Sequence, residues 1–566
     1  MTPKRCVVLL LALVLLAPVA RAAADKSDAA FPVTIRVDAG QSLGAWKPIW
    51  RFFGADEPNY ATMTEGRRLL GELGALRPKQ VYFRAHNLLS TGDGTPAPKW
   101  GSTNVYTEDA RGHPVYDWTI LDRIFDAGLA QGVRPYVELG FMPKALSIHP
   151  EPYQHQWRSR PPHGELFTGW AYPPNDYGKW GELAYELARH CVERYGRAEV
   201  ESWYWEVWNE PNIGYWQGTP GEWYRLYDYA VDGIRRALPT ARVGGPHSAG
   251  SGGAFMDGFL RHVISGANAA TGGTGAPADF LAFHAKGRVE FVDGHVRMSL
   301  RPQLQTLDEG FRKIAAVPAL KGRPVIIGES DPDGCAACQG PEFGYRTGPM
   351  YASYTAASVA RHLLLADRAG VNLEGMLTWA FEFEGQSLFA GQRVLATNGI
   401  DLPVLNVFRL LSRMGGRRLA TESTAEIPLD VIVRDGVRAS PDVGALASLD
   451  GRRLCVLAWH YHDDDLPGPD AEVALTLDHL PVASGPARLT RFRIDQDHSN
   501  AFAVWKQLGA PPSPSREQYA RLVAAGGLAA PEGPAPLALA DAAATLHFRL
   551  PRQGVTLLVI DLPGAP

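Results

Sequence analysis

Two glutamates lie at positions where a carboxyl group could take part in catalysis. Glu210 lies in the tract Trp-Asn-Glu-Pro-Asn at 208–212, and Glu329 lies in Gly-Glu-Ser at 328–330, each after a short β-rich run. A protonated carboxyl can give a proton to a leaving oxygen while an ionised carboxylate attacks a carbon or activates water. Glycoside hydrolysis needs such a pair, so these residues predict it if the fold brings them together.

An alternation of strand and helix patterns in the first 400 residues supplies a fold that would do so. Helical periodicity at 116–131, 180–195, 222–238 and 304–317 separates short apolar, β-rich segments. Eight such alternations predict an α/β fold, the (β/α)₈ TIM barrel. An open doubly wound sheet is disfavoured because the phosphate-binding glycine motifs of that class are missing. The eight strand segments are 52–56, 81–86, 135–139, 203–208, 242–245, 280–284, 325–329 and 376–381.

The pattern changes beyond residue 415. Short alternating segments separated by Pro, Gly and Asp predict an additional C-terminal antiparallel β-sandwich at 415–566. The barrel domain is then 25–414, and a strand at 32–37 is expected to join the β domain as an edge strand. The stretch 525–543, rich in Ala and Pro, is predicted to be a surface loop. The predicted strands are 429–434, 454–460, 473–477, 488–494, 545–550 and 555–560.

The N-terminus has the features of a secretory signal peptide. Lys4 and Arg5 precede an apolar run at 7–19 and the alanine-rich tract Ala-Arg-Ala-Ala-Ala at 20–24. The run is too short to span a bilayer, which takes about 20 residues. We therefore expect a signal at 1–24 and a secreted or periplasmic protein without a membrane partner.

The cysteines point to a disulfide rather than a metal. Of the four outside the signal, Cys335 and Cys338 form a Cys-x-x-Cys pair that no second pair completes as a zinc site. Three pairings are possible in an oxidising compartment, and a local Cys335–Cys338 bridge is favoured. The other two are Cys191 and Cys455.

Composition excludes several classes of protein. The 56 basic and 60 acidic residues give a net charge of −4, far from the basic balance of a nucleic-acid-binding protein.

Fifteen tryptophans are unevenly placed, and five of them lie within 203–223 around Glu210. Such a cluster forms a bulky core or a surface for stacking ligands. We expect Trp208 to line a sugar pocket and Trp203 and Trp205 to be core.

Several tracts together resemble a known family. The Trp-Asn-Glu-Pro tract at the fourth strand, with a glutamate ending the seventh, is similar to clan A of the retaining glycosidases. The wider sequence resembles family 39 of the glycoside hydrolases, which contains β-xylosidases and α-L-iduronidases. Further tracts that carry the resemblance, which covers 35–510, are 116–118, 134–143, 402–406, 498–501 and 504–505. It implies Glu210 as the general acid/base and Glu329 as the nucleophile, with retention of configuration.

Other polar residues at the predicted strand ends are candidates for the same site. Arg84 can hold Glu329 ionised, because an adjacent cation lowers the pKa of a carboxyl. Asn209, beside the acid, can hydrogen-bond a sugar 2-hydroxyl. His86, His284 and Trp379 are candidates for sugar hydroxyls and a stacking surface, with a purely structural role as the alternative for each.

Lys286 and Arg393 bear on the identity of the sugar. Their tracts, and Glu-Ser-Asp-Pro at 329–332, resemble the iduronidase side of the family, where a lysine and an arginine grip the substrate carboxylate. The tract 378–381 and the acidic Glu382 and Glu384 resemble the β-xylosidases instead. A pairing of Lys286 with one of these two glutamates is the alternative to substrate binding.

The sequence thus predicts a secreted retaining exo-glycosidase, foremost a β-xylosidase acting on plant-wall oligosaccharides. An α-L-iduronidase-like or α-L-arabinosidase-type enzyme is the alternative within the same class. A barrel that binds carbohydrate without cleaving it is the alternative from another class. No metal or organic cofactor is expected, since carboxylates alone supply acid/base and covalent catalysis.

Overall fold

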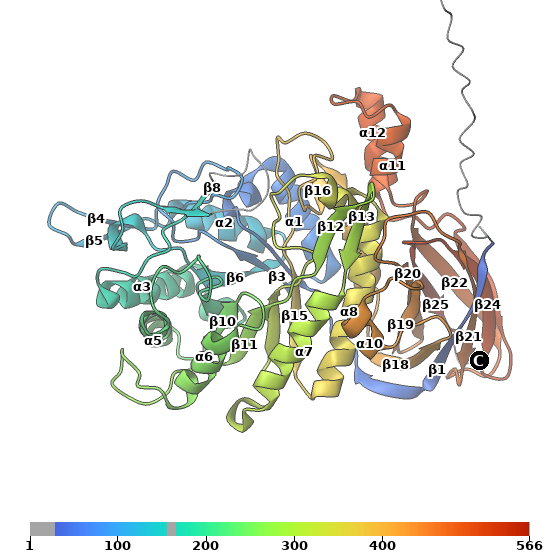
Figure 1. Ribbon diagram of the computed structural model, residues 1–566, viewed down its shortest axis with the longest axis horizontal. Coiled ribbons are helices and arrows are strands. Elements are labelled where there is room, and N and C mark those ends of the chain that lie inside the picture. The colour runs from blue at the N-terminus through green and yellow to red at the C-terminus, as the bar shows by residue number, and fades with distance from the viewer. Residues whose placement is uncertain (1–28, 156–165, 565–566) are drawn as a thin grey trace, which may run out of the picture.

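The computed structural model describes residues 29–155 and 166–564. The predicted signal at 1–24 lies outside the described residues. A barrel ringed by helices forms one part of the molecule, and a β-rich domain packs against one of its sides (Figure 1). No helix among the described residues is long and apolar enough to cross a membrane.

The barrel is closed and all of its strands are parallel, which confirms the predicted fold class. Its strands neighbour one another in the order β10-β11-β14-β15-β2-β3-β6-β9, and each matches one predicted segment. Their bounds are β2 (Phe52–Ala55), β3 (Val81–Ala85), β6 (Val133–Leu139), β9 (Tyr204–Val207), β10 (Arg242–Ser248), β11 (Phe280–His284), β14 (Val325–Glu329) and β15 (Leu373–Thr378).

Helices follow the strands and cover the outside of the barrel. Two of them begin at clear sequence signals: a Thr219–Glu222 capping box starts α5, and the Asp176 side chain caps α3. The predicted helices 116–131, 180–195, 222–238 and 304–317 correspond to α2, α3, α5 and α7. The bounds are α1 (Thr64–Leu76), α2 (Thr119–Ala130), α3 (Tyr177–Tyr195), α5 (Pro220–Ala237), α6 (Gly253–Ser265), α7 (Arg301–Ala315), α8 (Pro349–Ala369) and α9 (Pro403–Leu411).

The barrel interior has an aromatic layer below a charged layer. Alternate residues of a strand point to the same side, so the second residue after an inward aromatic also points inward. Tyr82 is followed in this way by Arg84, Tyr136 by Glu138 and Tyr204 by Glu206. The aromatic layer, which also holds Phe52 and Phe280, is a separate buried cluster. The charged layer lies one step nearer the strand ends.

The β domain is built on one nine-stranded sheet of mostly antiparallel strands. β1 (Phe31–Ala45) pairs with β18 and β21, so this N-terminal strand joins the domain as an interior strand rather than at an edge. The two end strands contact each other, so the sheet curls around a second hydrophobic core. The other strands are β18 (Arg417–Ser423), β19 (Asp442–Asp450), β20 (Arg453–Tyr461), β21 (Ala471–Asp478), β22 (Gly485–Ile494), β23 (Pro534–Leu539), β24 (Ala544–Leu550) and β25 (Val555–Asp561).

Two predictions for this domain are wrong. The segment 429–434 is a helix, α10 (Leu429–Asp435), because its buried residues Leu429 and Ile432 are spaced for one helix face. The stretch 525–543 is not simply a loop, since β23 lies within it and pairs with β22. Its prolines are tolerated because β23 is an edge strand.

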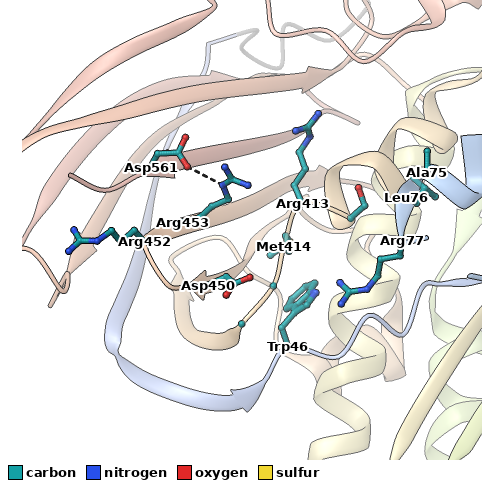
Figure 2. A pocket seen from close by; sticks show the side chains of 13 residues that line it. Trp46, Ala75, Leu76, Arg77, Arg413, Met414, Asp450, Arg452, Arg453 and Asp561 are labelled. Atoms are coloured by element: carbon teal, nitrogen blue, oxygen red, sulfur yellow. Dashed lines mark hydrogen bonds and ion pairs between the residues drawn. The ribbon is translucent and has the colours of Figure 1, made fainter. Parts of the chain in front are cut away.

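The two domains share an extensive interface. α8 is buried along nearly its whole length, and its Arg361 donates to the Asp442 carboxylate at 2.7 and 2.9 Å. A cavity of about 860 Å³ lies at the interface, with Trp46, Arg77, Arg413 and Asp450 around it (Figure 2). Arg77 follows the last residue of α1 and precedes β3, so this cavity lies at the end of the barrel where strands begin, away from the polar strand ends.

Candidate active site

The parallel strands bring the two predicted glutamates together. Glu210 follows β9 and Glu329 ends β14, and the carboxyl ends of parallel strands open at one mouth of a barrel. A carboxylate oxygen of each and a ring nitrogen of His284 all lie within 4.8 Å of one another. Residues far apart in the chain thus form one compact cluster.

A strained turn directs Glu210 into the mouth. Trp208 and Glu210 have φ angles of 72° and 44°, in the left-handed region that non-glycine residues rarely adopt. Trp208 locks the turn, because its ring is fully buried and its indole N–H donates to the Tyr215 carbonyl at 2.7 Å. Trp208 therefore anchors the turn from below and does not line a sugar pocket. Trp203 and Trp205 are also fully buried, as predicted for core.

Glu210 is protonated at neutral pH. Burial, together with the nearby charge of Glu329, raises its pKa to about 8. Its Oε1 lies 2.9 Å from Nδ1 of His284, and burial lowers the pKa of that histidine to about 3. A neutral histidine can accept the proton of a carboxyl group, so the contact favours the acid form of Glu210.

Glu329 is ionised. Burial would raise its pKa, but nearby positive charges, Lys286 foremost, outweigh it and hold the pKa well below the usual glutamate value. Lys286 Nζ lies 2.5 Å from Oε2, and Arg84 Nη1 lies 3.2 Å from Oε1. The contact predicted for Arg84 is present. The cluster therefore holds one protonated and one ionised carboxyl group side by side.

Lys286 is held by the Glu329 carboxylate at the end of β14 and by the Asp331 carboxylate two residues later. Its Nζ donates to Asp331 at 2.8 Å as well as to Glu329. The alternative pairing with Glu382 or Glu384 is wrong. Glu382 accepts from the backbone N–H of Gly399 at 3.0 Å, and Glu384 accepts from the backbone N–H of Glu65 at 2.8 Å.

Arg393 lies beneath the site. It is fully buried, its Nε donates to the Trp379 carbonyl at 3.0 Å, and its Nη1 donates to Asp333 at 3.0 Å. The loop that carries Asp333 is closed by a Cys335–Cys338 disulfide, which agrees with the favoured pairing. Cys191 and Cys455 are free and buried. Arg393 thus supports the loop and the backbone of Trp379.

The remaining predicted residues lie against the charged layer. The Trp379 ring is 98% buried; it packs over Arg84 at 4.9 Å and against His86 at 4.3 Å. His86 Nδ1 lies 2.6 Å from Oε2 of Glu138. Asn209 Oδ1 accepts from Arg84 Nη2 at 3.0 Å. Every predicted site residue thus lies in or directly behind the cluster around Glu210 and Glu329.

Arg84 is the centre of a buried network that sequence reasoning only partly found. Its guanidinium contacts Glu138 at 3.0 Å, Glu329 at 3.2 Å and also Glu206. Burial raises the pKa of Glu138 well above its usual value, whereas Arg84 and His247 overcome burial and lower the pKa of Glu206. Glu206 was not predicted as part of the site, and His247, a polar residue at a predicted strand end, was given no role in it. The alternation Tyr204–Glu206 in one strand was the available signal.

Removing the Arg84 guanidinium is expected to destabilise the fold strongly. Arg84→Met leaves ionised carboxylates buried without their cation, which typically costs about 3–5 kcal/mol. Urea unfolding at pH 7 measures this loss. Arg189→Met is the control, since Arg189 forms its ion pairs with Glu186 and Glu193 on the surface of α3 and such pairs contribute about 1 kcal/mol or less. Equal losses in the two variants would contradict the role of Arg84.

The cluster has the donor types of a metal site but the wrong charge for one. Glu210, His284 and Glu329 offer one ligand atom each. Lys286 and Arg84 already place two positive charges on the Glu329 carboxylate, and Glu210 carries a proton. A divalent cation would meet like charges there, which oppose its binding.

Comparison with known proteins agrees with this chemistry. Residues 33–539 match the family described as Glycosyl hydrolases family 39. A β-xylosidase of Geobacillus stearothermophilus is 27% identical over 465 residues, covering 78% of this chain and 79% of that protein. The α-L-iduronidase of Homo sapiens is 27% identical over 568 residues, covering 92% and 77%. The crystal structure of a monomeric β-xylosidase from Caulobacter crescentus CB15 shares the fold, with a TM-score of 0.72 at 22% identity over 94% of this chain and 100% of that chain. Since the family match spans most of its length, the chain belongs to family 39 of the glycosyl hydrolases.

Proposed function

We propose that this glycoside hydrolase is a secreted, retaining exo-β-xylosidase that removes xylose from plant-wall oligosaccharides. Glu329 attacks the anomeric carbon, the bond to the leaving oxygen breaks, and the proton of Glu210 passes to that oxygen. The Glu210 carboxylate then takes a proton from a water molecule whose oxygen attacks the same carbon and displaces Glu329. The signal predicted at 1–24 supports the extracellular setting.

The spacing and protonation of the two glutamates carry this proposal. Their nearest carboxylate oxygens lie no more than 4.8 Å apart. Retaining enzymes have carboxyl groups about 5–5.5 Å apart, whereas inverting enzymes need about 6.5–9.5 Å to admit a water molecule. Glu210 holds a proton and Glu329 does not, so each group is ready for the role that the proposal gives it.

A neutral sugar suits the charges of the site better than a uronic acid. Lys286 is neutralised by Glu329 and Asp331, and the guanidinium of Arg393 is fully buried against Asp333. A substrate carboxylate would have to compete with these protein carboxylates. The similarity to β-xylosidases supports the same choice.

A uronide is the second candidate substrate. Lys286 keeps 18% of its side chain exposed in the site, and α-L-iduronidases are also among the relatives. If a uronate is the substrate, Lys286→Ala should abolish turnover of an aryl α-L-iduronide. An unchanged rate would exclude a uronide as the substrate.

A panel of aryl glycosides tests the proposed function. We expect an aryl β-D-xyloside to give the highest kcat/KM, ahead of an α-L-arabinoside and an α-L-iduronide, and NMR to detect β-xylose as the first product. First release of α-xylose would contradict retention. Tight oligosaccharide binding in calorimetry with no turnover of any glycoside would indicate a non-catalytic binding protein instead.

The rate should depend on pH as a bell-shaped curve. Glu329 acts ionised and its pKa is depressed, so kcat/KM should fall only below the usual glutamate range. Glu210 acts protonated, so kcat/KM should fall as the pH rises through about 8. Initial rates of phenyl β-xyloside hydrolysis at substrate concentrations below KM measure both limbs. A basic limb near pH 5 would contradict the protonated state assigned to Glu210.

A further inference from the structure

Two histidines connect Glu210 to a buried carboxylate of β9, the strand that Glu210 itself follows. His284, at the end of β11, has its Nδ1 2.9 Å from Glu210 Oε1 and its Nε2 3.4 Å from Nδ1 of His247. His247, in β10, contacts Glu206 of β9 through its Nε2. Both rings are fully buried. The side chains thus form a continuous chain from Glu206 through His247 and His284 to Glu210.

A glycine of the strand that carries Glu329 makes room for this chain. A Cβ atom on Gly328 would stand 2.1 Å from His247 Nδ1 and 3.0 Å from His284 Nε2. The first distance is shorter than real Cβ contacts, so any other residue type would displace the His247 ring. The two histidines therefore meet directly over the backbone of Gly328, the residue before Glu329.

The ionised Glu206 carboxylate selects one arrangement of protons in the chain. Glu206 is an ionised acceptor beside Arg84, so Nε2 of His247 must carry a proton. In a neutral imidazole the other nitrogen is then an acceptor, so Nδ1 of His247 takes the Nε2 proton of His284. That leaves Nδ1 of His284 as an acceptor, and its partner Glu210 must be the donor.

The surrounding groups are consistent with two neutral histidines. The Tyr136 hydroxyl lies 2.7 Å from Nε2 of His247, and the charges of Arg84 and Lys286 face the pair. Glu329 faces His284 at 3.7 Å. Burial, the largest influence, lowers the pKa of His247 to about 4 and that of His284 to about 3.

We propose that His247 is a positioning residue that keeps Glu210 in its acid form by fixing the tautomer of His284. This role rests on the proposed function, in which Glu210 is the general acid. Without an acceptor at His247 Nδ1, His284 can carry its proton on Nδ1 and donate it to Glu210. That hydrogen bond stabilises the ionised form of Glu210 and lowers its pKa.

The test compares two replacements of His247. His247→Leu removes the acceptor, whereas His247→Asn puts an amide oxygen near the position of Nδ1 and cannot reach Glu206. We expect the basic limb of kcat/KM against pH to move down by about one unit in the Leu variant and to stay close to wild type in the Asn variant. Phenyl β-xyloside is the probe, because its poor leaving group needs the acid. His460→Leu, at a buried histidine of the β domain, is the control and should leave the limb in place.

The outcomes separate this inference from the proposed function. A purely structural role of His247 would lower the rate at every pH and leave the basic limb unmoved, which would overturn the inference. If the basic limb of kcat/KM lies at the same pH in the Leu and Asn variants, the inference is overturned as well. Should circular dichroism show that the Leu variant is unfolded, His247→Gln replaces it, since its longer amide points toward Glu206. A wild type that hydrolyses no aryl glycoside would refute the proposed function instead.

Discussion

Glu329→Gln is expected to lower kcat/KM on aryl β-xylosides by about 10⁵-fold, the scale seen when a covalent nucleophile is removed. An amide has nearly the shape of the carboxylate but cannot form the glycosyl ester. The change also removes the negative charge that Lys286 and Arg84 contact at 2.5 and 3.2 Å. Initial rates with a nitrophenyl β-xyloside measure the loss, and circular dichroism checks that the variant is folded.

A matched control comes from the same face of the barrel. Glu384→Gln keeps an acceptor for the Glu65 N–H and lies outside the cluster, so its rate should stay within about twofold of wild type. Mass spectrometry of the wild type with a 2-fluoro-xylosyl inactivator should find the sugar on the peptide that contains Glu329. Label on another carboxylate, or a Glu329→Gln variant as active as Glu384→Gln, would disprove the assignment.

Glu210→Ala should have the second largest effect, and it should depend on the leaving group. Loss of the proton donor slows phenyl β-xyloside by about 10³- to 10⁴-fold, because general acid catalysis contributes about 10²–10⁴ and the general base is lost as well. The first step with dinitrophenyl β-xyloside should be affected far less, since its leaving oxygen needs no proton. Burst and steady-state kinetics with the two substrates measure the difference.

A small anion should restore part of the lost rate. Azide fits the space left by the Glu210 carboxylate and attacks the anomeric carbon without a general base, so the Ala variant should form β-xylosyl azide. The same salt should not accelerate Glu329→Gln, which forms no glycosyl-enzyme. NMR of the product identifies the anomer. An α-azide from Glu210→Ala would reverse the roles assigned to the two glutamates, and equal acceleration of both variants would contradict the assignment.

The sequence predicts the barrel well because its strands carry strong local signals. Each runs as a short apolar segment between helical patterns, and the polar residue at its end, such as Glu210 or Glu329, marks the mouth. Local signals are weaker in the β domain. The segment 429–434 satisfies both the strand and the helix period, and only its packing against the rest of the protein selects α10.

What the sequence could not predict are the partners of buried charges. Nothing in the sequence distinguishes Asp331 from the other acidic residues as a partner for Lys286. The two meet because the closed barrel brings them together. His247 and Glu206 are likewise on neighbouring strands whose register the sequence does not reveal. The prediction for Trp208 was wrong for a different reason. Its place beside Glu210 suggested a pocket wall, but a φ of 72° turns its ring into the protein.

The aromatic layer below the charged layer affects how protons reach the buried charged groups. Phe52, Tyr82, Tyr136, Tyr204 and Phe280 fill the barrel on the side away from the mouth. We therefore expect Arg84 and its carboxylates to exchange protons with solvent through the mouth of the barrel. In the proposed mechanism, the proton that the leaving group takes comes from Glu210, at this mouth, and is regained from the water that ends the cycle.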